Sequence, residues 1–146
     1  LKPKGYVIFE DPYLGDIIRK TSYDQIYDEH AFYFSLASVR YLFSQYDMDV
    51  VDVYPQNVHG GSMRYVISHR GACPVSSSVR NLERSETALK LDQRETYSIF
   101  RANVEKVRID LIALLNDLKK QGKRVAGYAA TSKRKPASRG IAMFMR

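Results

Sequence analysis

The chain has 146 residues, of which 45% are hydrophobic and 27% charged, and a formal net charge of +7. This composition is typical of one soluble globular domain and excludes a disordered or fibrous chain. No apolar run approaches the roughly 20 residues of a membrane span, and the start shows no signal-peptide pattern, so we expect a cytoplasmic protein without a membrane partner. The single cysteine, Cys73, excludes an internal disulfide and a zinc cage built from cysteines of this chain.

The positive charge is concentrated at the end of the chain. Residues 1–100 contain 11 Lys and Arg against 13 Asp and Glu, whereas residues 101–146 contain 12 against 3. The pattern favours a solvated basic tail, with a phosphate-binding arm as the alternative. Because the basic residues are not interleaved with aromatic ones as in single-strand binders, we expect no nucleic-acid partner.

The first strand is predicted close to the start of the chain. Residues 6–9 are all β-formers and follow a Pro/Gly turn. Glu10 and Asp11 come directly after them, at the end of a strand where α/β sheets line binding sites; the alternative is that Asp11 and Pro12 only end the strand. Residues 14–34 show no sustained period, which predicts a long loop with one or two short helical turns, and such loops are commonly functional.

A helix and two strands are predicted next. Ser35 is a suitable N-cap, and the helix that it begins is expected to end near residues 45–47. Its apolar face consists of Leu36, Val39, Leu42, Phe43 and Tyr46. Strands are predicted at 49–54, ended by Pro55, and at 63–68 after a glycine turn. This order favours the antiparallel end of an α/β sheet.

The second half of the chain is predicted to be largely helical. A Gly/Pro/Ser-rich connector at 71–81 indicates a domain boundary, a helix is expected around 79–91, and a long helix from about 96 to 120. One face of the long helix carries Phe100, Val104, Val107, Leu111, Leu114 and Leu118. We expect this stripe to be buried against a partner domain or a second copy, which predicts a homo-oligomer. Gly122 is expected to end the helix, and Arg124–Tyr128 to form a buried strand.

The most distinctive chemical motif is Tyr27-Asp28-Glu29-His30. A histidine can act as a general base near neutral pH, a carboxylate beside it can orient the ring, and a phenol can hydrogen-bond an enolate oxygen. The alternative is a polar helical turn on the surface. A metal site is a further alternative, although no His-x-x-x-His spacing supports it. Its ligands would be Asp28, Glu29, His30 and His59.

Two other segments have a structural and a functional interpretation. His59-Gly60-Gly61-Ser62 could form a backbone nest for an anion or a tight hairpin turn, and the strands predicted on both sides favour the hairpin. Cys73 lies in a Gly-Ala-Cys-Pro turn without a matching catalytic dyad, so we expect an inert thiol.

Several of these segments together resemble one enzyme family. The Tyr-Asp-Glu-His and His-Gly-Gly-Ser motifs, in that order and spacing, are similar to those of S-adenosylmethionine-dependent C-methyltransferases that act on nucleotide-linked keto-deoxysugars. The matching segments are residues 2–13, 14–30, 34–40, 58–64 and 127–133. The resemblance departs from the family pattern at Ala129, where glycine is common, and after Lys133.

The resemblance implies an α/β fold in which the last strands of an incomplete Rossmann-like methyltransferase sheet precede long helices and the start of a second α/β domain. Residues 1–70 would end the methyltransferase domain, 71–95 would form a connector with a short helix, and 96–133 would begin the C-terminal domain. Residues 134–146 form an aberrant basic tail. Because the sequence holds no G-x-G-x-x-G or G-x-G-x-G loop, we expect this chain to lack most of the S-adenosylmethionine site, together with the family's N-terminal zinc module, as in a truncated or frame-altered product.

The resemblance also implies a role for each candidate site residue. His30 would remove a proton from the carbon next to the sugar's keto group, and Tyr27 and Glu29 would assist. The resulting enolate would accept the methyl group of S-adenosylmethionine. Contacts with the nucleotide-sugar substrate are expected from His59, Tyr128 and Lys133.

Two functional hypotheses follow. In the first, the chain is the catalytic C-terminal portion of a sugar C-methyltransferase and is inactive alone. In the second, it is a non-catalytic accessory or interaction fragment that oligomerises through its long helix and binds a nucleotide-sugar. Binding of S-adenosylmethionine by this chain and by a longer one would separate them.

Overall fold

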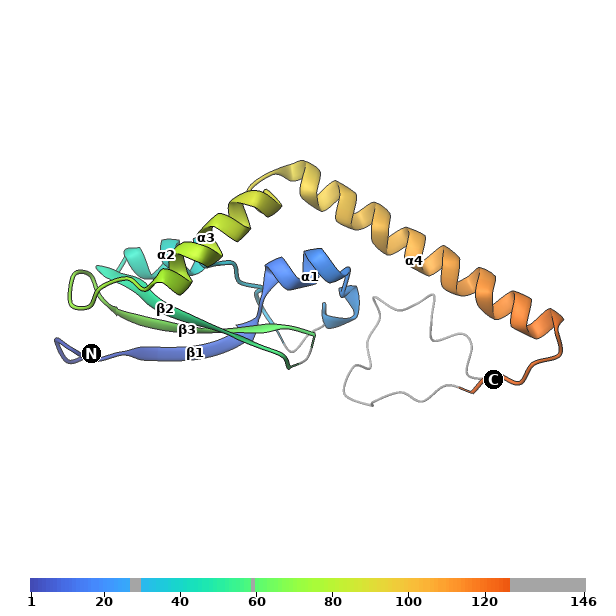
Figure 1. Cartoon of the computed structure of the whole chain (residues 1–146), viewed down its shortest axis with the longest axis horizontal. Helices are drawn as coiled ribbons and strands as arrows, with labels where there is room; N and C mark the ends of the chain where they lie inside the picture. Colours follow the sequence, from blue (N-terminus) through green and yellow to red (C-terminus); the bar gives the residue numbers. More distant parts are fainter. Residues whose placement is uncertain (27–29, 59, 127–146) are drawn as a thin grey trace.

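A computed structural model of the chain describes residues 1–26, 30–58 and 60–126. It has a mixed α/β fold, in which helices cover a small antiparallel sheet (Figure 1). The strands are β1 (Val7–Pro12), β2 (Met48–Gln56) and β3 (Ser62–His69). Their order is β1-β3-β2, so β1 and β2 both run antiparallel to the central strand β3. The two strands predicted around the glycine turn and their antiparallel pairing are thereby confirmed.

Both outer strands continue through a proline at which the sequence suggested an end. β1 pairs with β3 through Pro12, which lies opposite Ser62, and β2 pairs through Pro55, which lies opposite Met63. Each of these strands has β3 on one side only, among the residues described. Proline is tolerated on such edges because its missing N–H can face away from the ladder. Asp11 is therefore part of the strand and not a residue beyond it.

The helices are as long as the sequence predicted, with small shifts at their ends. They are α1 (Leu14–Lys20), the 3₁₀ turn η1 (Tyr23–Gln25), α2 (Leu36–Ser44), α3 (Ser77–Leu89) and α4 (Arg94–Lys120). α1 and η1 confirm the short helical turns expected in the long loop. The predicted cap of α2 is also confirmed, since the Ser35 hydroxyl accepts a hydrogen bond from the backbone N–H of Ser38 and the Ser38 hydroxyl accepts one from the N–H of Ser35.

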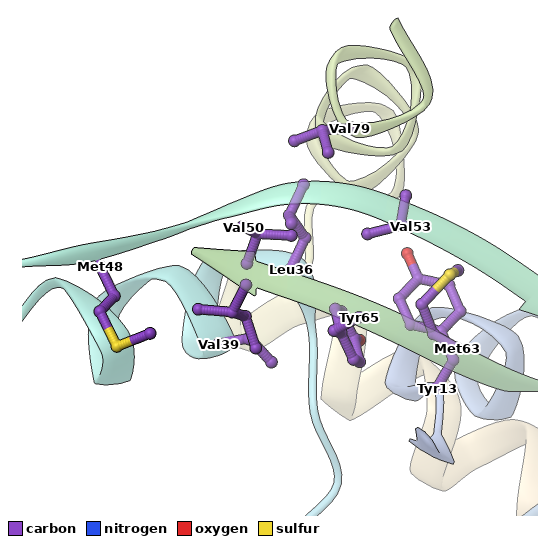
Figure 2. Packing of buried hydrophobic residues seen from close by; sticks show 10 residues of the cluster. Tyr13, Leu36, Val39, Met48, Val50, Val53, Met63, Tyr65 and Val79 are labelled. Carbon is purple, nitrogen blue, oxygen red and sulfur yellow. The ribbon is translucent and has the colours of Figure 1, made fainter. Parts of the chain in front are cut away.

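The hydrophobic core lies where α2 and α3 pack on the sheet. Leu36 and Val39 of α2 meet Tyr65 of β3 and Val50 of β2, and Val79 of α3 closes the cluster beside β2 (Figure 2). The predicted apolar face of the helix is wrong at its far end: Leu42 is 46% and Tyr46 71% exposed. Tyr46 is exposed because α2 ends at Ser44 and the chain leaves the helix direction before that residue.

The opposite face of the sheet has no helix over it in the part of the chain that is described. Ile8 is 60% exposed there, and Tyr6 and Tyr54 are about half exposed. Together with Arg64 and Val66 they line a shallow hollow. An apolar sheet face of this kind is usually covered by further protein.

α4 extends away from the sheet, and its contact with the rest of the chain is mainly at α1 (Figure 1). None of its 27 residues is buried, and Val107 and Leu114 of the predicted stripe are 43% and 55% exposed. The expected long helix is confirmed and its stripe is not buried within this chain, so its burial against a partner domain or a second copy stays a prediction. The helix ends at Lys120, with Gln121 as its C-cap, and Gly122 follows at a φ of +67°, as predicted for a glycine stop.

The strand expected at Arg124–Tyr128 is not formed over its described part. Residues 123–126 belong to no helix or strand and are exposed. Without a neighbouring strand there is no ladder to hold them extended. In the ranges that the structure describes, no helix is both long and apolar enough to cross a membrane.

Candidate active site

The site forms where β1 ends, because the long loop brings His30 back to Asp11. The imidazole Nδ1 of His30 lies 3.0 Å from Oδ1 of Asp11. The two side chains are 28% and 25% exposed, and Oδ1 itself is hidden from solvent. The Tyr33 ring stands beside the imidazole, with 5.9 Å between the ring centroids. A histidine with a carboxylate on one ring nitrogen is an arrangement suited to proton transfer at the other.

Burial and charge act in opposite directions on the Asp11 carboxyl. Partial burial raises the pKa of Asp11, and the charge and hydrogen bond of His30 act to lower it; burial has the larger effect. A negative charge on Asp11 is therefore costly by itself and becomes more favourable when His30 is protonated.

Backbone contacts fix both ends of the loop that carries His30. The N–H of Leu14 donates to the carbonyl of Phe34 at 2.9 Å, which places the two ends of the loop side by side. Within the loop, the hydroxyl of Tyr33 donates to the carbonyl of Gln25 at 2.8 Å. The chain therefore returns to the end of β1, and His30 reaches Asp11 although 18 residues lie between them in the sequence.

Side chains of α1 and η1 fill the space beside the Gly60-Gly61 turn. Gly60 and Gly61 have φ angles of +85° and +133°. A Cβ atom on Gly61 would lie 2.1 Å from Oδ2 of Asp16, and one on Gly60 would lie 2.3 Å from Nε2 of Gln25. Lys20 donates a hydrogen bond to the Gly60 carbonyl at 2.6 Å. Because these side chains fill the space beside the turn, which joins the antiparallel strands β2 and β3, the hairpin interpretation is confirmed.

Comparison with known proteins decides the family. A model of the C-methyltransferase C-terminal domain family matches residues 57–136, which is more than half of the chain. The chain belongs to this C-methyltransferase family. It is also similar to C-methyltransferase NovU of Streptomyces niveus, with 34% identity over 134 residues. That alignment covers 91% of this chain and 32% of NovU, so the chain spans about a third of the length of this C-methyltransferase.

Of the residues predicted for the C-methyltransferase site, His30 lies in the described part of the chain. The others, which fall outside the described residues, are Tyr27, Glu29, His59, Tyr128 and Lys133. The contact that sequence reasoning missed is the one between His30 and Asp11. The sequence feature that could have indicated this contact was the carboxylate at the end of the first strand. The residues next to His30 in the sequence were, however, the more obvious partners.

Proposed function

We propose that the chain carries the proton-abstracting residues of a cytoplasmic C-methyltransferase that acts on a nucleotide-linked keto-deoxysugar. The observation that supports the proposal most directly is His30, held at the end of β1 with its Nδ1 beside Asp11. Membership of the C-methyltransferase family supplies the reaction class. The sugar, its nucleotide carrier and the assisting roles of Tyr27 and Glu29 are part of the proposal.

In the proposed step His30 acts as a general base. Its Nε2 removes the proton from the carbon next to the keto group, and the electrons of that C–H bond move into the enolate of the substrate. His30 becomes an imidazolium, while Tyr27 and Glu29 assist by orienting the base or the enolate oxygen. Contacts from His59, Tyr128 and Lys133 would hold the nucleotide-sugar.

The methyl donor of this proposal is S-adenosylmethionine, which supplies an electrophilic methyl group when bound. The described residues do not fit a site for it. The turn at Gly60 and Gly61 is filled by Gln25 and Asp16, so it offers no open glycine cradle for a cofactor. The proposal accordingly places the donor, and the zinc of the family's N-terminal module, on parts of a longer protein, and this chain would be inactive alone.

We also propose that β1, β3 and β2 are the last strands of a larger Rossmann-like sheet. The exposed face around Ile8, and the edge of β1 without a strand partner among the described residues, support this. Residues 1–70 would then end the methyltransferase domain, 71–95 would form the connector, and 96–133 would begin the C-terminal domain. In a longer enzyme the backbone amides of β1 should exchange with deuterated water more slowly than in this chain.

The proposed function is tested by exchange of the substrate's α-proton with deuterated water, a step that needs no methyl donor. In a full-length enzyme that carries this segment, His30→Ala should lower the exchange rate about 10²–10⁴-fold, as expected for loss of a general base. Glu29→Gln and Tyr27→Phe should cost less. His69→Ala is the matched control, because His69 is at the far end of β3 from the Gly60-Gly61 turn. Exchange at the parent rate in His30→Ala would show that His30 is a structural loop residue.

The exposed stripe of α4 supports a second candidate function, a homo-oligomeric interaction fragment. Val107 and Leu114 are exposed within the chain, and a second copy would cover them. Sedimentation velocity over a range of concentrations tests this, since oligomerisation predicts a concentration-dependent increase in sedimentation coefficient. A single monomeric species at the highest concentration would contradict it.

A further inference from the structure

We propose that Asp11 is a positioning residue for His30. Nδ1 of His30 lies 3.0 Å from Oδ1 of Asp11, close enough for the ring to donate a proton to the carboxylate. An imidazole that carries its proton on Nδ1 has its lone pair on Nε2. The contact with Asp11 therefore favours the tautomer in which the Nε2 lone pair can act as the base. The kinetic part of this inference rests on the proposed function; the tautomer does not.

The pairing of β1 with β3 holds the backbone around Asp11 in place, so the Asp11 carboxylate can orient the imidazole ring of His30. Asp11 pairs with Met63 across the β1–β3 ladder, and Pro12 pairs with Ser62. The next residue, Tyr13, is only 2% exposed and donates its N–H to the Gly61 carbonyl. Since Oδ1 is also hidden from solvent, water does not compete for the position opposite Nδ1. A residue at this place can thus orient a side chain that comes from a long loop.

Asp11 also brings a negative charge to the side of His30. When His30 holds a proton, the Asp11 carboxylate lies directly against the positive charge. The charge of Asp11 also acts on Tyr65, whose burial raises its pKa, so its phenol stays neutral. Of these two groups, only Asp11 carries a negative charge when it is ionised. Removing the charge without removing the acceptor should separate its two effects.

Three variants make that separation. Asp11→Ala removes both the acceptor and the charge, and Asp11→Asn keeps an acceptor oxygen of the same shape without the charge. Glu10→Ala is the matched control, because Glu10 precedes Asp11 in β1 but is engaged by Arg64 on the exposed face of the sheet. If Asp11→Ala does not fold, judged by circular dichroism, Asp11→Asn still tests the inference through its loss of charge.

The first measurement is the ¹⁵N spectrum of histidine in this chain, which holds three histidines. At a pH of about 9, where an imidazole is neutral, the parent, Glu10→Ala and Asp11→Asn should show His30 protonated on Nδ1. Asp11→Ala should shift the ring toward protonation on Nε2. A His30 tautomer that is the same in Asp11→Ala as in the parent overturns the inference.

The second measurement is α-proton exchange in the full-length enzyme. Asp11→Ala should lower the rate of exchange at saturating substrate about 10-fold or more, with little change in KM, and Asp11→Asn should lower it less. Loss through KM alone would contradict a role on the base. If Asp11→Ala changes the tautomer but neither it nor His30→Ala slows exchange, the proposed function is wrong while the orienting contact stands.

Discussion

Glu86 of α3 accepts a hydrogen bond from the backbone N–H of Leu36 at 2.6 Å, and with it caps the N-terminus of α2. Its second carboxylate oxygen accepts from the N–H of Ala37 at 3.2 Å. Glu86 is only 7% exposed. A buried carboxylate is tolerated here because two unpaired helix donors and the positive end of the helix dipole surround it. One side chain thus joins two helices through residues that are 50 positions apart in the sequence.

Replacing Glu86 should therefore destabilise the chain more than replacing an exposed acid of the same helix. Glu86→Ala leaves two donors without an acceptor and should cost about 1–3 kcal/mol of unfolding free energy. Glu83, which pairs with Arg40 on the surface, is the control, and Glu83→Ala should cost about 1 kcal/mol at most. Urea unfolding followed by circular dichroism measures both. Equal losses would mean that the cap contributes no more than a surface ion pair.

The close packing of Gly61 against Asp16 gives a second prediction. Gly61→Ala adds a Cβ atom within 2.1 Å of Oδ2 of Asp16 at a φ of +133°, and should cost about 2–4 kcal/mol. Gly71, also in the left-handed region at +76°, has no atom near its missing Cβ. Gly71→Ala should therefore show the backbone strain alone, about 1 kcal/mol.

A double variant identifies the cause. If the contact with the carboxylate is responsible, Asp16→Ala should reduce the additional loss caused by Gly61→Ala. The coupling free energy from the four unfolding curves measures the effect. Purely additive losses would place the cost in the backbone of the turn and not in its contact with α1.

Asp52 gives a prediction about pH. Partial burial acts to raise the pKa of Asp52, but hydrogen bonds from Ser78, Tyr54 and Ser76 and from the backbone N–H of Val53 outweigh it and lower the pKa to about 2. Since the unfolded carboxyl titrates near 3.8, the folded state gains stability from the ionised form. That gain is complete above about pH 4 and is lost as the pH falls through 2.

The difference in unfolding free energy between the parent and Asp52→Ala should thus be constant from pH 5 to 7 and shrink between about pH 4 and 2. Ser78→Ala removes one of the hydrogen bonds and should reduce this dependence on pH. Urea titrations at half-unit pH steps provide the curves. A difference that persists unchanged to pH 2 would show that the hydrogen bonds do not depend on the charge of Asp52.

The exposed stripe of α4 leads to a fourth prediction. Leu114 is 55% exposed, so Leu114→Glu should change the unfolding free energy of the monomer by no more than about 0.5 kcal/mol. Val39, which is fully buried in α2, is the control, and Val39→Glu should cost several kcal/mol or prevent folding. Urea unfolding at low protein concentration compares them. A large loss of unfolding free energy in Leu114→Glu would show that this face of α4 packs against another part of the folded chain.

Local patterns in the sequence were sufficient for most elements. The Ser35 cap, the strand at 63–68 and the long helix all depend on residues within a few positions of each other, and each is confirmed. The stripe of α4 was recognised as apolar, but periodicity alone does not show which protein covers it. The strand expected at 124–128 failed over 124–126 for the same reason, since β-forming residues need a neighbouring strand.

The site was harder to predict than the fold. His30 was recognised from its motif, whereas Asp11 as its partner depends on a loop whose two ends meet at Leu14 and Phe34. Such a contact depends on how the loop folds back to the end of β1, and no residue spacing in the sequence indicates it. The contacts of Gly61 and Asp16 were missed for the same reason: the sequence indicated a turn but not the surface on which the turn packs.

α4 is joined to α3 at a single bend, so a small rotation at that bend would displace the far end of α4. Its 27 residues extend about 40 Å at 1.5 Å per residue. The bend begins at Lys90, in the left-handed region at a φ of +53°, and is held where the hydroxyls of Thr96 and Tyr97 donate to the carbonyls of Lys90 and Leu91. A rotation of about 10° at this bend would move the far end of α4 by about 7 Å. The hydrogen bonds at the bend, together with the contact between α4 and α1, thus determine where the far end of α4 lies.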